Sequence, residues 1–128
     1  MPLYWTIDSK ARLFTGVAEG KVTLNDAVDL LEAMAGAKAM AYRKLFDGRA
    51  AAPTMTSDEM LSLCARIRDY HDQGMMGALA LVATPEQTMV FARLLGALAS
   101  AKRPIRVFTS PRQARNWIED LPKEHAAP

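Results

Sequence analysis

The stretch Gly77–Ala83, GALALVA, decides the fold class of this chain. Every residue in it is apolar or glycine, so a strand built from it would be apolar on both faces. Such strands are typical of the centre of a parallel sheet that is covered on two sides. Because parallel neighbours must be joined by a crossover, usually a helix, the stretch predicts an α/β domain.

The segments before this strand extend the prediction. Residues 3–7 (LYWTI) and 12–20 (RLFTGVAEG) are rich in β-branched and aromatic side chains and flank the turn-forming DSKA, which predicts an antiparallel hairpin. Residues 22–36 (VTLNDAVDLLEAMAG) then change to helical spacing. Residues 41–48 (AYRKLFDG) predict a short third strand that ends at Gly48.

Three further helices are predicted by apolar residues at helical spacing and by capping residues at their starts. They begin with Thr56, Thr84 and Ser110, and a last strand, IRVF, lies at 105–108. The helix from Thr84 is expected to bury the apolar residues Val90, Phe91, Leu94, Leu95 and Leu98. The predicted order is ββαβαβαβα, a single α/β sandwich of about five strands and four helices. Its sheet starts with the hairpin and is otherwise largely parallel.

Length and charge restrict the class of protein. A chain of 128 residues fits one domain, which we place at 1–122, with 123–128 as a flexible tail. The net charge of +2 is small and the basic residues are spread along the chain, so we expect no nucleic-acid partner. The longest run without polar side chains, 75–83, is about half the ~20 residues of a membrane span. Because the N-terminus also lacks the pattern of a secretory signal, we expect a cytoplasmic protein without a membrane span.

Motifs for catalysis or cofactor binding are missing from the sequence. Two histidines and one cysteine provide no recognisable metal-ligand spacing, and no phosphate-binding glycine loop or nucleophile elbow occurs. Cys64 and His71 share a predicted helical face, but seven residues separate them by about 10 Å along the axis, too far for a nucleophile and base pair. We therefore expect no enzyme, metal or cofactor.

Several segments resemble the SpoIIAA-like proteins of the STAS superfamily. The resemblance covers most of the chain: the hairpin, EGKVTLNDAVDLL (19–31), YRKLFDGR (42–49), GALALVA (77–83) and VFTSPRQARNWI (107–118). In the last segment, a strand that closes on Phe leads into a helix with Ala114 and Trp117 three positions apart. The resemblance implies a small cytoplasmic domain without known catalysis, related in fold to anti-sigma-factor antagonists and more distantly to CRAL-TRIO lipid-transfer domains.

The same resemblance raises the question of a phosphorylation switch. In the antagonists, a serine at the start of the helix after the third strand is phosphorylated to change partner binding. The matching region is Thr54–Asp58, which makes Thr56 and Ser57 the candidate phosphorylation sites. The antagonists' Asp-Ser followed by Ser-Gly is replaced here by Thr56-Ser57-Asp58-Glu59. The residues themselves favour a capping box between Thr56 and Glu59, and the acids in the first turn would repel a phosphate.

Candidate binding residues lie at the predicted carboxyl edge of the sheet, where open α/β folds bind ligands. Asp47 either lines a site there or forms a turn with Gly48. Helix starts at this edge offer unpaired N–H groups that suit an anion, such as a phosphate-bearing ligand or a partner's carboxylate. The candidates for binding a ligand or partner are Asp47, Arg49, Thr54, Thr56, Ser57, Thr84, Ser110 and Arg112.

The expected role is therefore binding. The leading hypothesis is a regulatory module that contacts a protein partner, with a homodimer as one form of that contact. The alternative is a small-ligand carrier for an anionic or apolar, lipid-like molecule at the carboxyl edge. The chain is also rich in methionine, which fits either an irregular core or an adaptable apolar surface.

Overall fold

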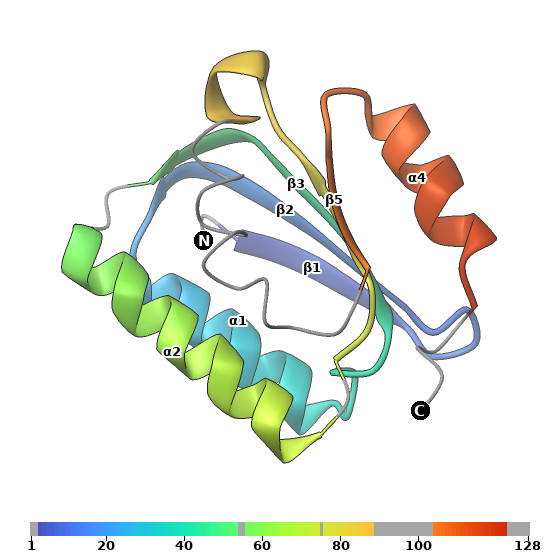
Figure 1. Cartoon of the computed structure of the whole chain (residues 1–128), viewed down its shortest axis with the longest axis horizontal. Helices are drawn as coiled ribbons and strands as arrows, with labels where there is room; N and C mark the ends of the chain where they lie inside the picture. The colour runs from blue at the N-terminus through green and yellow to red at the C-terminus, as the bar shows by residue number, and fades with distance from the viewer. Residues whose placement is uncertain (1–2, 54–55, 75, 89–103, 123–128) are drawn as a thin grey trace.

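The fold is one five-stranded sheet with helices on both faces (Figure 1). The computed structural model describes residues 3–53, 56–74, 76–88 and 104–122. The strands are β1 Leu3–Asp8, β2 Leu13–Val22, β3 Arg43–Pro53, β4 Leu79–Val82 and β5 Ile105–Phe108. The helices are α1 Leu24–Gly36, α2 Ser57–Gln73 and α4 Pro111–Asp120, and a further helical segment begins at Pro85.

The sheet has the predicted mixed topology. Its strands follow the chain order β1-β2-β3-β4-β5, with β1 antiparallel to β2 and every later pair parallel. The carboxyl ends of β2 to β5 therefore point toward the same edge. The α/β prediction with an N-terminal hairpin is confirmed. The predicted tail, 123–128, and the apolar residues from Val90 to Leu98 lie outside the described residues.

The bounds predicted for the third strand were wrong. Instead of ending at Gly48, β3 continues to Pro53, so the segment read as a loop up to Pro53 is strand. The predicted Asp47–Gly48 turn is a β-bulge, because Val17 pairs with Asp47 whereas Glu19 pairs with Ala50. Alanine is a poor strand former, but pairing with the end of β2 holds residues 50–53 extended.

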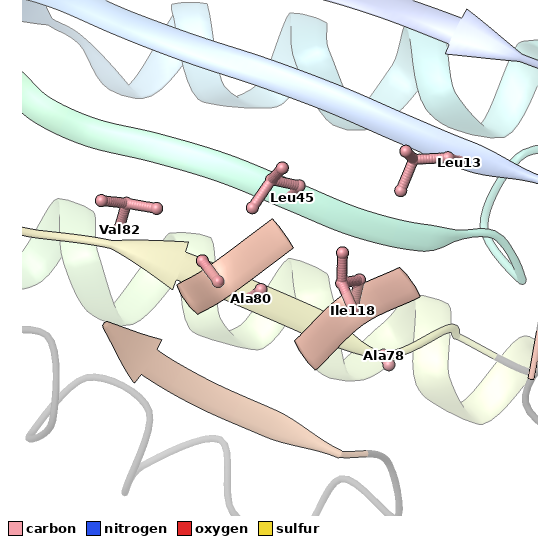
Figure 2. Close-up of a cluster of buried hydrophobic side chains, with 7 residues drawn as sticks. Leu13, Leu45, Ala78, Ala80, Val82 and Ile118 are labelled. Carbon is pink, nitrogen blue, oxygen red and sulfur yellow. The ribbon is translucent and has the colours of Figure 1, made fainter. Parts of the chain in front are cut away.

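Each face of the sheet has its own apolar core, because successive strand residues point to opposite faces. On one face, Ile118 of α4 packs in a cluster with Leu13 and Leu45 (Figure 2). On the other face, Phe14 packs with Met34 of α1. Figure 1 shows α1 and α2 together on that second face and α4 on the first.

Candidate functional site

The carboxyl edge of the sheet is not a single rim of helix starts. Asp47, Val82 and Phe108 lie side by side across β3, β4 and β5, so Thr84 and Ser110 both follow two residues beyond this row. Strand β3 instead runs on for another six residues to Pro53, about 20 Å of extended chain. Thr84 and Ser110 therefore lie at equivalent positions after their strands, whereas Thr56 and Ser57 follow the much longer β3 and lie away from them.

The hydroxyls at these helix starts act as caps. The Thr56 Oγ1 accepts from the Glu59 N–H at 3.1 Å, while the Thr56 N–H donates to Glu59 Oε1 at 3.0 Å. Thr84 and Gln87 form the same reciprocal pair at 3.2 and 2.9 Å. In each capping box, two backbone donors that an anion could use are already occupied.

The start of α4 is capped more simply. The Ser110 Oγ accepts from the Gln113 N–H at 3.3 Å, and Pro111 occupies the first helical position. Among the described residues, the Gln113 side chain returns no bond to the Ser110 N–H, so only the serine half of a capping box forms. Arg112, the next candidate, is exposed on the first turn of α4, and its side chain makes no hydrogen bond or salt bridge with any described residue.

Gln87 ties the bulge of β3 to the neighbouring helix start. Its Nε2 donates to the carbonyl oxygens of Gly48 and Ala51 at 3.1 and 3.3 Å. Because the bulge interrupts the normal strand pairing, these bonds give partners to one carbonyl inside the bulge and one just after it. The amide therefore fixes the backbone that carries Arg49, a role that sequence reasoning did not assign to Gln87.

Asp47 and Arg49 form a two-point ion pair on this bulge. Asp47 Oδ2 accepts from Arg49 Nη2 at 2.7 Å, and Oδ1 accepts from the Nε and backbone N–H of Arg49 at 3.0 and 3.1 Å. The side chains are 26% and 44% exposed, respectively. The hydrogen bonds from Arg49 hold the pKa of the Asp47 carboxyl below its usual value, and Asp47 raises the pKa of Arg49. Both groups therefore stay charged at neutral pH.

A pocket of about 320 Å³ opens beside this ion pair. It lies between the carboxyl halves of β2 and β3, with an apolar part and three charged side chains. Its lining residues are Val17, Ala18, Glu19, Asp47, Arg49 and Ala50. Sequence reasoning found Asp47 and Arg49 but missed Val17 and Glu19. Only the register of β2 against β3 brings these residues together, and no local motif carries that signal.

The other candidates are not gathered at this pocket. Ser57 is exposed at the first turn of α2, and Thr54 lies outside the described residues. A second pocket of about 520 Å³ lies along α2, between Ser62 and Gln73. Cys64 of the same helix is buried, and burial raises the pKa of its thiol despite the opposing charge of Arg68. The Cys64 thiol is therefore protonated at neutral pH, which does not suit a nucleophile.

The described residues form neither a metal site nor a membrane-spanning helix. Residues 3–53, 56–74, 76–88 and 104–122 contain no group of three or more His, Cys, Asp or Glu side chains that could hold a metal ion. Within the same ranges, the helices are too short or too polar to cross a membrane.

Comparisons with known proteins identify the fold. No family model matches the chain, and neither does any curated protein. Among solved structures, the chain is similar to an uncharacterised DUF3478-family protein from Shewanella loihica PV-4 that has a SpoIIAA-like fold. The TM-score is 0.65 over 91% of this chain and 93% of that one, at 15% sequence identity. The resemblance read from the sequence is thus confirmed at the level of architecture: this chain has a SpoIIAA-like fold.

Proposed function

We propose that the protein is a non-enzymatic binding domain that works by contacting a protein partner at the carboxyl edge of the sheet. The observation that carries this proposal is that polar side chains near this edge are held in place by hydrogen bonds within the protein. The side chains of Thr84 and Ser110 cap helices, Gln87 holds the bulge, and Asp47 holds Arg49. Groups that are fixed in this way form a rigid surface suited to recognition.

The pKa directions support binding over catalysis. A general acid or base works best with a pKa near the working pH, and active sites often move a pKa in that direction. Among the described residues, the resolved shifts run the other way: the pKa of Asp47 is lowered, and those of Arg49 and Cys64 are raised. All three groups therefore keep their ordinary protonation state at neutral pH.

The pocket at Asp47 and Arg49 offers both apolar and charged contacts to a binding partner. Its volume of about 320 Å³ is at the lower end of the range for small-ligand sites, about 300–1,000 Å³. A side chain from a partner could pack on Val17 and pair with the charges around it. A small amphiphilic ligand is the second candidate, because the same pocket offers the Arg49 guanidinium beside apolar side chains.

Photocrosslinking tests this proposal. A benzophenone amino acid at Ala50, which is exposed in the pocket lining, should give a discrete adduct in a host lysate. The same probe at Glu32, which is exposed on α1, is the matched control. An adduct of twice 14.1 kDa identifies a second copy, and any other mass identifies a different protein. Native mass spectrometry that finds a bound small molecule, with no adduct at Ala50, would support the carrier instead.

A further inference from the structure

No helix among the described residues covers one half of the α4-side face of the sheet. Helix α4 lies over β3, β4 and β5. Strand β1 and the carboxyl half of β2 form the remainder of that face. In β1, Trp5 and Ile7 pack on the opposite face with Leu30 of α1, so Tyr4 and Thr6 point to the uncovered side.

The strand register shows which residues share this uncovered surface. Tyr4 stands opposite Val17, which stands opposite Asp47, and Thr6 stands opposite Thr15. Tyr4 is 51% exposed, and Thr6 is also exposed. The pocket at Asp47 continues the surface toward the carboxyl edge. We call this surface the open face, and it consists of Tyr4, Thr6, Thr15, Val17, Glu19 and Arg49.

The open face carries one unmatched charge of each sign. The Glu19 side chain is exposed and makes no hydrogen bond or salt bridge with the described part of the chain. Arg49 gives Asp47 its Nε and one Nη2 proton, so its Nη1 donors have no partner among the described residues. Because Asp47 holds the guanidinium in a bidentate pair, these donors are presented in a fixed direction.

We propose that the open face binds the open face of a second copy of this chain. This inference rests on the proposed binding role and names the partner. A two-fold contact requires a patch that is complementary to itself. When two copies meet across an axis between Glu19 and Arg49, the Glu19 of each meets the Arg49 of the other. A partner surface of a single sign would instead leave one of these charges opposed by a like charge or unpaired. With Asp47 of the ion pair and with Lys21, which is exposed farther along β2, the surface and its rim hold two carboxylates and two cations, so neither sign dominates.

The neutral part of the face fits the same contact. The Tyr4 ring and the Val17 side chain supply apolar area beside the charges, and tyrosine and arginine are enriched at interface hot spots. The patch is small compared with the ~20–30 residues per side of a standard interface. The dimer is therefore expected to be weak and to form only as the protein concentration rises.

A charge exchange tests the proposal. Sedimentation equilibrium of the full chain, from micromolar to about millimolar concentration, should show a monomer–dimer equilibrium. Glu19→Arg and Arg49→Glu should each weaken self-association at least roughly tenfold, because like charges then meet twice across the axis. An equimolar mixture of the two variants should restore association, because each altered charge meets its opposite. Glu32→Arg on α1 makes the same charge change away from the face and should leave the equilibrium unchanged.

Further variants and a folding check distinguish a lost contact between copies from a misfolded protein. Adding Asp47→Asn to the Arg49→Glu variant removes the repulsion between two neighbouring carboxylates within one chain. Circular dichroism verifies that each variant is folded. Tyr4→Ser alters an exposed residue only and should also weaken the dimer. Wild-type protein that stays monomeric at millimolar concentration overturns the proposal, as does a mixture that fails to associate. If such a monomeric protein crosslinks from position 50 to a different protein, the proposed binding role is kept. Only the second copy is then excluded as the partner.

Discussion

At the scale of single residues, Arg43 is a buried charge that joins the end of a helix to the sheet. It is 6% exposed, yet its guanidinium has no carboxylate partner among the described residues. Its Nη1 donates to the carbonyl oxygens of Ile118, Glu119 and Leu121, each at 3.2 Å, and its Nη2 donates to that of Ala11 at 2.6 Å. A helix leaves its last carbonyls unpaired and carries partial negative charge at that end. Arg43 therefore fastens the end of α4 to the sheet.

We predict that Arg43→Met lowers the free energy of unfolding by roughly 2–4 kcal/mol, because buried carbonyls lose their donor. Urea denaturation measures the change. Arg115→Met is the matched control, since the Arg115 side chain is 49% exposed and, among the described residues, pairs only with Glu119. That pair should contribute less than about 1 kcal/mol. Equal losses for the two variants would contradict the role assigned to Arg43.

The pair of Asp47 and Arg49 predicts a pH dependence of stability. Hydrogen bonds from Arg49 lower the pKa of Asp47 in the folded state, whereas in the unfolded chain it returns to about 4. The pair therefore stabilises the folded protein above about pH 4, and this contribution is lost as pH falls through the lower folded pKa.

We predict that the stability difference between the wild type and Asp47→Asn is constant from pH 5 to 7 and shrinks below about pH 4. Urea denaturation across this range measures it. Asp58→Asn, in the exposed first turn of α2, provides a carboxylate control without Arg49. A difference that persists unchanged to pH 2 would show that Asp47 acts through something other than its charge.

At the scale of elements, the starts of the helices could be predicted from sequence and the end of β3 could not. Thr56 and Thr84 cap their helices as expected because a capping box depends on residues three positions apart. The extension of β3 depends on pairing with β2, a contact between distant segments. The same contact builds the pocket, so Asp47 and Arg49 were recognised as candidates whereas Glu19 was not.

The capping role of Thr56, one of the two candidate phosphorylation sites, gives a prediction for stability. Thr56→Ala should lower the free energy of unfolding by about 0.5–2 kcal/mol, because the Glu59 N–H loses its acceptor. Thr56→Asp should retain most of the stability, since aspartate also caps well. Ser57→Ala, at the exposed next position, should change stability by less than about 0.5 kcal/mol. Thermal denaturation compares the three variants, and a harmless Thr56→Ala would remove the capping role.

At the scale of the whole molecule, one sheet separates two cores that share its strands. Leu13 and Phe14 are neighbours in β2, yet Leu13 packs with Ile118 of α4 and Phe14 packs with Met34 of α1. Each core therefore depends on the same backbone pairing, although their side chains meet on opposite sides. This arrangement predicts a single cooperative unfolding transition, as is usual for small domains.

We predict that Ile118→Ala and Met34→Ala each lower the free energy of unfolding by about 2–5 kcal/mol, since both side chains are buried. Because the two residues lie on opposite faces and belong to separate clusters, the double variant should show the sum of the two losses to within about 0.5 kcal/mol. Urea denaturation should give coincident transitions by tryptophan fluorescence and by circular dichroism. Separate transitions would mean that α4 unfolds on its own, and that the sheet does not couple the two cores.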